Sequence, residues 1–448
     1  MAKTYLTMTN DSAATNSKKW TFSTWVKLGK KASSNQTIVS AGTSSGPYTQ
    51  IKITSDDRLQ VYSSNSFGGS GATNLKSSRR LYDSAAWYHF VVAFDSTEGT
   101  QSNRLKMWIN NEQVTDFSTN TNAIALNEDN DTMGANAKLQ VVGRFVDSDS
   151  EYFGGTLSQT AFVDGSALTP SSFGQTNTAT GVWKVKSAGA TWGNNGWLLQ
   201  YEDSGASAAV DNFGSDSSGN GNHFASNNLG SHPNTQNTPE NSFCQWNKIT
   251  QRGGSVSANG LTETTDDNNS ILGNIVMPNG STSKYYWEIK ISAGNNNAVG
   301  IAPASQSFRC STTFGINDFN IAWYGADGRV FNFGTTSQAA DGGRQFGAGD
   351  ILGFRCDMNG GSVDMYKNGS AVGSAEGWNT TTYPNMVIMV RKGGSSNTTI
   401  LNAGCPDFTI TGNSGNGYSD AAGYGKFQYA VPTGYYALCT ANVAAYGG

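Results

Sequence analysis

Apolar and polar residues alternate in short runs along the chain, and glycine, asparagine and serine separate the runs. In residues 20–28, one face carries Trp20, Phe22, Val26 and Leu28, with Thr24 as a polar exception. This two-residue period is typical of strands that bury one face. No long segment shows the three- and four-residue apolar spacing of an amphipathic helix. We therefore expect an all-β protein.

Each half of the chain contains an apolar strand, a loop, an alternating strand and a tight turn. In the first half this pattern spans residues 87–111 and ends in an Asn-Asn pair. In the second half it spans residues 349–369 and ends in an Asn-Gly pair. Both pairs tolerate the positive φ that a two-residue hairpin turn requires. The repetition predicts two antiparallel β-sandwiches in tandem.

The strand-like runs place the first sandwich in residues 1–175 and the second in residues 246–448. Residues 176–245 contain few apolar residues, and we expect them to form a mostly irregular connector. A loop of this length is unusual within a compact protein unless it packs on something. Aromatic residues in the connector favour such packing: Trp183, Trp192, Trp197 and Tyr201.

Composition excludes several classes of function. Only 14% of the 448 residues are charged and the net charge is −4, which gives no basic footprint for nucleic acid. No apolar run is long enough to span a membrane, and the first residues carry no apolar signal core. We therefore expect synthesis and assembly in a cytoplasm. The five cysteines are dispersed, which favours isolated buried thiols over a zinc site.

No catalytic pattern is found. A retaining glycosidase needs two carboxyl groups about 5–5.5 Å apart, which alternating acids on one strand would supply. The nearest acidic cluster, residues 147–151, lies in a turn-like stretch and is interpreted as a solvated loop, with a cation site as the alternative. His89 lies within an apolar strand and is interpreted as a satisfied sheet residue. We expect no catalytic residue and no enzymatic activity.

Two groups of motifs resemble known domains. The first half is similar to the laminin-G-like, concanavalin A-like jelly roll in these blocks: residues 22–28, 87–95, 105–111 and 153–170. The second half is similar to a SPRY domain in these blocks: residues 285–291, 298–302, 349–357, 363–369, 383–384 and 399–404. The resemblance implies a concanavalin A-like jelly roll followed by a SPRY-like sandwich.

Residues 216–244 and 425–442 resemble segments of tailed-phage virion proteins. This resemblance implies a display protein on the virion surface, such as a tail or head fibre tip, an adaptor or a decoration. Its partners would be other virion proteins and a host-surface polysaccharide. A homo-oligomer, most simply a trimer, is expected. A glycan hydrolase on the first sandwich and a bacterial surface adhesin are the alternatives.

Three aromatic residues of the connector are the candidates for glycan or interface contacts: Trp192, Trp197 and Tyr201. Their rings could stack on sugars or cover a neighbouring chain, and the alternative is that they anchor the connector to a sandwich. The resemblance to jelly-roll lectins also raises calcium as a cofactor, held by acidic residues 128–131 or 147–151. The alternative is that both loops are simply solvated, and no other cofactor is expected.

Overall fold

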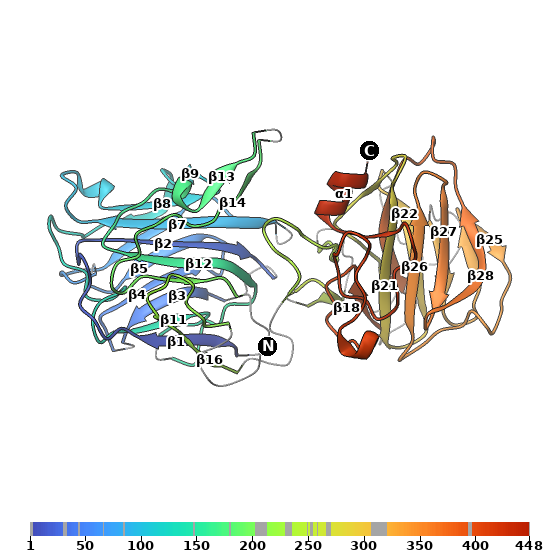
Figure 1. The fold of residues 1–448 in the computed structure, drawn as a ribbon, viewed down its shortest axis with the longest axis horizontal. Helices are drawn as coiled ribbons and strands as arrows, with labels where there is room; N and C mark the ends of the chain where they lie inside the picture. The colour runs from blue at the N-terminus through green and yellow to red at the C-terminus, as the bar shows by residue number, and fades with distance from the viewer. Residues whose placement is uncertain are drawn as a thin grey trace. The chain divides into compact units, whose positions relative to one another are not determined.

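The computed structural model divides the chain into two compact units, Met1–Asn234 and Thr235–Gly448 (Figure 1). It describes residues 3–447 apart from these gaps: 30–33, 44, 66, 84–85, 147, 179–180, 202–212, 229–234, 249, 251–253, 258, 266–269, 306–319 and 393–396. The regular structure of the described residues is almost entirely antiparallel sheet, which confirms the all-β prediction.

The first unit is a sandwich of two large sheets. Its eight-stranded sheet has the order β10-β6-β5-β4-β3-β11-β1-β16, and its six-stranded sheet has the order β15-β12-β2-β7-β8-β9. A small hairpin, β13-β14, is separate. The bounds are β1 Tyr5–Thr9, β2 Lys19–Lys27, β3 Gln36–Gly42, β4 Tyr48–Ile53, β5 Leu59–Ser63, β6 Thr73–Ser77, β7 Trp87–Asp95, β8 Leu105–Ile109, β9 Glu112–Gln113, β10 Phe117–Thr121, β11 Leu139–Val142, β12 Thr156–Asp164, β13 Gly174–Thr176, β14 Trp183–Val185, β15 Trp197–Leu199 and β16 Ala225–Asn227, with short 3₁₀ turns η1 Gln101–Asn103 and η2 Pro170–Ser172.

The core of the first unit follows from the alternation seen in the sequence. Trp20, Phe22 and Val26 of β2 face the buried side, as predicted, and pack with residues of the eight-stranded sheet. The polar exception, Thr24, is fully buried and has a specific partner. Its hydroxyl lies 2.8 Å from the hydroxyl of Thr160, to which Tyr201 also donates at 2.8 Å. A buried hydroxyl is tolerated because it is hydrogen-bonded.

The predicted connector is not a separate element, and this corrects the expected boundaries. β15 pairs with β12 and β16 pairs with β1, so the two strands extend the two large sheets of the first unit. Trp197, Phe213 and Phe224 join its core. Strand addition thus explains the burial of Trp197. Residues 235–245, in contrast, belong to the second unit.

The second unit is also a sandwich. One sheet has the order β17-β18-β30-β21-β26-β27-β28 with β31 beside β21, and the other has the order β19-β29-β22-β23-β24-β25 with β20 beside β29. The bounds are β17 Ser255–Val256, β18 Thr262–Thr265, β19 Ser270–Leu272, β20 Met277–Pro278, β21 Lys284–Ala293, β22 Asn297–Pro303, β23 Ile321–Tyr324, β24 Val330–Asn332, β25 Thr335–Gln338, β26 Ile351–Asp357, β27 Ser362–Lys367, β28 Ser370–Gly377, β29 Asn385–Lys392, β30 Asn397–Asn402, η3 Asn413–Gly415, β31 Tyr436–Ala437 and the helix α1 Thr440–Tyr446.

A buried carboxylate holds the C-terminal segment of the second unit on its sheet. Glu288 of β21 accepts the backbone N–H groups of Gln428 and Tyr429 at 2.9 Å each. It also accepts the Asn402 amide at 3.0 Å and the Tyr286 hydroxyl at 3.2 Å. Burial raises the pKa of Glu288 to about 7, although the amide donors oppose this shift. The Glu288 carboxylate therefore has a structural role, because it attaches the C-terminal segment to β21.

The two tight turns use the same device. Asn110 and Asn368 have positive φ values of 52° and 49°. The Asn110 side chain accepts the His89 N–H at 2.7 Å, and the Asn368 side chain accepts the Ile351 N–H at 2.9 Å. Asparagine thus supplies both the turn geometry and one further ladder bond, since its side-chain oxygen substitutes for a backbone carbonyl.

The division into units predicts that residues 235–448 fold alone. We expect this fragment to be soluble and β-rich by circular dichroism. A fragment starting at residue 246 loses Phe243 and Cys244, which are 1% and 0% exposed and lie against the C-terminal segment. It should be less stable by roughly 3 kcal/mol or more, as for loss of a core aromatic. Aggregation of the longer fragment, or equal stability of the two, would contradict this account.

Candidate functional site

One side of the eight-stranded sheet of the first unit carries polar side chains in place of a second apolar layer. Ile51, Val61 and Leu75 point into the core. The alternate positions of the same strands point outward, and we call them the polar face: Tyr48, Gln50 and Lys52 of β4, Gln60 and Tyr62 of β5, and Asn74 and Lys76 of β6. The strand register aligns them in rows, Gln50–Tyr62–Asn74 and Lys52–Gln60–Lys76.

Glu151 closes one end of the polar face. Its carboxylate accepts the Asn35 amide at 3.0 Å and the Thr37 hydroxyl at 3.1 Å, and the Gln50 amide also donates to it. Its backbone carbonyl accepts the Thr37 N–H at 2.8 Å. The Lys52 ammonium lies 3.7 Å from the carboxylate. Glu151 is thereby bonded to β3 and β4, although it follows β11 in the chain.

Aromatic rings lie beside these amides. The rings of Tyr48 and Tyr62 have centroids 5.7 Å apart, and Phe145 meets Tyr48 edge-on at 4.9 Å. All three side chains are partly exposed. Burial raises the pKa of the Tyr48 hydroxyl, so it stays a neutral donor and acceptor. The polar face therefore presents aromatic surface next to fixed hydrogen-bonding groups.

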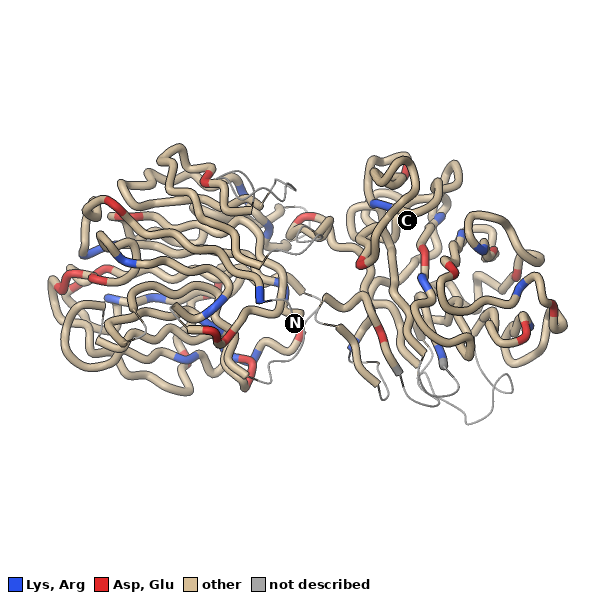
Figure 2. Tube along the Cα trace, turned by 90° about the horizontal axis from the view of Figure 1, so that it is seen from below, with Lys and Arg blue, Asp and Glu red and all other residues tan. Residues whose placement is uncertain are grey.

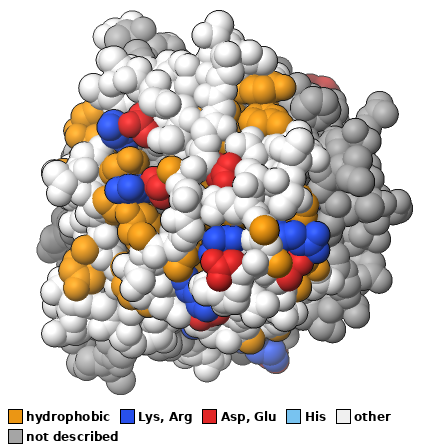
Figure 3. Space-filling view, turned by 90° about the vertical axis from the view of Figure 1, so that its right-hand side faces the viewer, with side chains coloured by type: hydrophobic (Ala, Val, Ile, Leu, Met, Phe, Trp, Pro, Cys, Tyr) orange, Lys and Arg blue, Asp and Glu red, His pale blue; other side chains and the backbone are white. Residues whose placement is uncertain are grey.

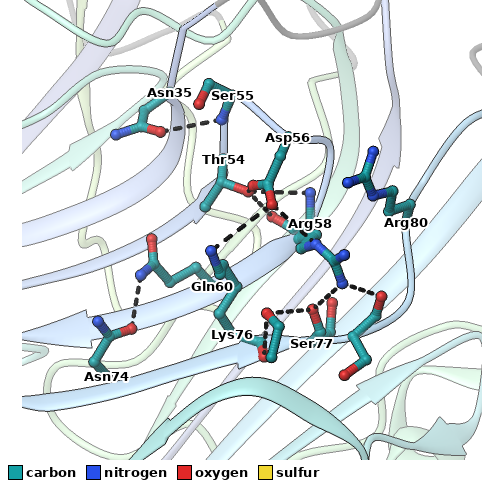
Figure 4. Close-up of polar contacts among 12 residues, drawn as sticks. Asn35, Thr54, Ser55, Asp56, Arg58, Gln60, Asn74, Lys76, Ser77 and Arg80 are labelled. Atoms are coloured by element: carbon teal, nitrogen blue, oxygen red, sulfur yellow. Dashed lines mark hydrogen bonds and ion pairs between the residues drawn. The ribbon is translucent and has the colours of Figure 1, made fainter.

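The turn between β4 and β5 borders the polar face near Gln60 and Lys76 (Figure 4). The Asp56 carboxylate accepts a hydrogen bond from the Thr54 hydroxyl. It accepts a second one from Arg58 Nε at 3.0 Å. Lys76 is 3.7 Å from the same carboxylate, and Gln60 donates to Asn74 at 2.7 Å. The Thr54 hydroxyl makes the largest contribution that lowers the pKa of Asp56, so its carboxyl group is ionised at neutral pH.

The connector residues predicted to contact glycan or another chain lie elsewhere. Trp197 is 0% exposed and stacks on Phe162, which excludes it as a surface contact. Tyr201 is partly buried and bonded to Thr160, and burial raises its pKa. Trp192 packs on the outer side of the six-stranded sheet. Anchoring, the alternative interpretation, describes the packing of these three residues.

The Asn- and Gly-rich segment 216–222 also has a structural role. Asp216 accepts the Leu198 and Ser218 N–H groups at 2.9 and 2.8 Å. Asn220 and Asn222 donate to the Gly196 carbonyl at 2.9 and 2.8 Å. The segment therefore fixes the turn that leads into β15. It contributes no residue to the polar face.

The acidic loops considered for calcium use their oxygens within the protein. Glu128 accepts the Gly69 and Ala125 N–H groups, and Asp129 pairs with Lys18 at 2.6 Å. Burial raises the pKa of Glu128. Asp147 lies outside the described residues. Within the described part of the chain, no group of three or more His, Cys, Asp or Glu residues is placed to hold a metal ion.

A serine–histidine pair lies on the outer side of the six-stranded sheet. Ser23 Oγ is 2.9 Å from His89 Nε2, and the Trp183 indole donates to His89 Nδ1 at 3.0 Å. Because Nδ1 accepts, the proton of the neutral ring is on Nε2. Ser23 and His89 are 1% and 0% exposed, so a substrate cannot reach them. The prediction that His89 is a satisfied sheet residue is confirmed.

The remaining reactive groups are structural. Cys244, Cys356, Cys405 and Cys439 are buried thiols outside any disulfide, as predicted, while Cys310 lies outside the described residues. Acidic and basic residues are scattered over both units (Figure 2). On the face of the second unit seen in Figure 3, charges of both signs lie next to one another. Arg355 and Asp364 of the second unit form an ion pair at 2.8 Å.

The polar face was missed in the sequence because its signal is weak. Alternation in residues 48–53 and 59–62 predicts strands with a solvated side, and Gln, Lys, Asn and Tyr suit such a side. Glu151 belongs to the loop interpreted as solvated. Its partners Asn35, Thr37 and Gln50 are more than a hundred residues away, so no local pattern reveals the contact.

Two family models match the chain, and each covers less than half of it. Residues 1–172 match the Laminin_G_3 model of the concanavalin A-like lectin/glucanases superfamily, and residues 284–397 match the SPRY domain. The chain therefore contains a laminin-G-type, concanavalin A-like domain and a SPRY domain, in the order expected. No curated protein matches the chain. No helix among the described residues is long and apolar enough to cross a membrane.

Solved structures with similarity to parts of the chain include three of different kinds. The SPRY domain of human HERC1 is 15% identical, with a TM-score of 0.30, 36% of this chain covered and 98% of that one. A heptameric SAP-like pentraxin from Limulus polyphemus is 16% identical, with a TM-score of 0.31, and the match covers 51% of this chain and 90% of that one. A Bacteroides ovatus protein described as a candidate for carbohydrate binding is 14% identical, with a TM-score of 0.34, and the match covers 50% of this chain and 56% of that one.

The burial of His89 predicts that the stability of the first unit falls in acid. Burial lowers its pKa to about 3, below the ordinary value of 6.5. Between these values the unfolded chain binds a proton that the folded chain does not, so stability falls as pH falls below about 6.5. By pH 4.5 the cost is about 2–3 kcal/mol. His89→Gln, which does not titrate, should lose that much less between pH 7 and 4.5 in urea unfolding. An identical pH response of the two proteins would contradict this assignment.

Proposed function

We propose that this protein is a non-enzymatic binding protein that holds a glycan on the polar face of its first unit. The observation that carries the proposal is the combination of fixed amide and carboxylate groups with partly exposed tyrosine rings on one sheet face. The concanavalin A-like, lectin-type fold of residues 1–172 is compatible with this function.

The chemistry of the polar face suits sugars. A sugar hydroxyl both donates and accepts, and the amides of Gln60 and Asn74 offer both functions side by side. Their mutual bond of 2.7 Å holds them in place before a ligand arrives, which lowers the entropy lost on binding. The exposed part of the Tyr48 and Tyr62 rings is apolar surface against which the C–H groups of a sugar ring can pack.

The same groups are poorly suited to hydrolysis. A general acid needs a pKa near the working pH, whereas the Thr54 hydroxyl and other contacts lower the pKa of Asp56. The Glu151 carboxylate is occupied by the donors of Asn35, Thr37 and Gln50. A carboxylate so engaged is a poor nucleophile or base. Binding without turnover is therefore the function that the site supports best.

The proposed setting is a virion surface, where the protein would be a fibre tip, adaptor or decoration. Support comes from the resemblance of residues 216–244 and 425–442 to segments of tailed-phage virion proteins. In this proposal the first unit contacts host-surface polysaccharide, and the second unit attaches to other virion proteins. Homo-oligomerisation, with a trimer favoured, remains a prediction from that resemblance, since the connector aromatics do not support it.

Substitution of the polar face tests the binding proposal. Tyr62→Ala and Gln60→Ala should each weaken glycan binding roughly tenfold, because about 1.4 kcal/mol of contact is lost. Binding of the full chain to a panel of bacterial surface polysaccharides, measured by biolayer interferometry, gives the comparison. Tyr366→Ala, a partly exposed tyrosine on β27 of the second unit, is the matched control and should bind like the wild type. Equal binding by all variants would contradict the proposal.

Absence of turnover is tested separately. Incubation of the full chain with β-glucans and with any polysaccharide that it binds should release no new reducing ends. If reducing ends appear and the increase is lost in Glu151→Gln, the first unit is a hydrolase and the proposal of a pure binding protein is overturned.

A further inference from the structure

Two lysines occupy one row of the polar face. Lys52 on β4 and Lys76 on β6 are both register partners of Gln60 on β5. Their Cα atoms are thus separated by two strand steps, or about 10 Å. Gln60 lies between them, and Tyr62 lies two residues along the same strand. The row therefore places a cation, an amide and a second cation in line across three strands.

Both ammonium groups form long ion pairs. Lys52 is 3.7 Å from Glu151, and Lys76 is 3.7 Å from Asp56, both beyond the usual hydrogen-bond distance. The two carboxylates are already engaged by closer donors, Thr37 for Glu151 and Arg58 for Asp56. The side chains of Lys52 and Lys76 remain 11% and 25% exposed. Each lysine can therefore donate a hydrogen bond to a further anion.

The environment of Lys52 supports this interpretation. Burial is the largest influence on its pKa and lowers it, and the attraction of Glu151 does not fully compensate. The charged form thus pays a desolvation cost in the free protein. A bound carboxylate would offset that cost with a charge-assisted hydrogen bond, which is stronger than a neutral one.

We infer that the glycan held on the polar face is an acidic polysaccharide with a carboxylate on every second sugar. Successive carboxylates bind Lys52 and Lys76, and the intervening sugar lies on Gln60. The two-strand separation is similar to the length of a disaccharide repeat in an extended chain, which is why alternate sugars are specified. The inference rests on the proposed function and names the class of glycan.

The test compares charged and uncharged forms of the same polymers. The full chain is measured against hyaluronan, chondroitin and heparosan, against their carboxyl-reduced forms, and against the neutral glucan pullulan. The wild type should bind at least one carboxylated polymer tenfold or more tightly than its reduced form, and added salt should weaken that binding. Lys52→Gln and Lys76→Gln should each weaken it roughly tenfold, consistent with loss of a charge-assisted bond.

Two further variants separate charge from folding. Lys52→Arg keeps the charge and should retain most of the binding. Lys106→Gln removes a lysine that is similarly exposed and loosely paired with Glu98 at 3.5 Å on the six-stranded sheet, and it should bind like the wild type. Thermal melting of each variant confirms that it is folded.

The possible failures are distinguishable. Binding to pullulan or to the carboxyl-reduced polymers as tight as to the carboxylated ones overturns the acidic-glycan inference and leaves the proposed function standing. Carboxylate-dependent binding that survives both glutamine substitutions, or falls equally in Lys106→Gln, also overturns it. If no polymer of either class binds, the inference fails together with the proposed function.

Discussion

The carboxylate of Glu151 is the constraint on which the polar face depends. Glu151 has a φ of 52°, a conformation that costs a non-glycine residue of order 1–3 kcal/mol. It persists because Asn35, Thr37 and Gln50 donate to the carboxylate. These bonds hold the loop after β11 against the outward side of β3. The strands beyond it, β4 to β6, carry the polar side chains that stay partly exposed.

The acidic side chains discussed above have different surroundings in the two units. In the second unit, Glu288 is buried beneath the C-terminal segment, and its donors come from that segment and from β21 and β30. That carboxylate is fully used in holding the fold. In the first unit, Lys52 and Lys76 lie at 3.7 Å from their carboxylates and remain partly exposed.

Much of the fold could be predicted from the sequence because its determinants are local. Alternation in residues 20–28 identified the buried face of β2, and the pairs that begin with Asn110 and Asn368 identified both tight turns. The structure of the connector was harder to predict. Its strands β15 and β16 are three residues each, too short for a periodic signal, and their partners β12 and β1 are distant in the sequence.

The candidate site could not be predicted because it depends on contacts between distant segments. Trp197 was a candidate because it is an aromatic residue in a polar segment. In the sequence, however, a tryptophan buried in the core looks the same as a tryptophan that stacks on a sugar. The useful signal was the polar phase of the strand-like runs, Gln50 with Tyr62 and Gln60 with Lys76. Only the register between strands shows that these residues are neighbours.

The most direct test of the central claim is a crystal structure of the full chain with a bound oligosaccharide from a polymer that it binds. The account predicts sugar density on the polar face, with a ring against Tyr62 and hydroxyls bonded to Gln60 or Asn74. Density on the outer side of the six-stranded sheet, or on the second unit with the polar face unoccupied, would contradict it.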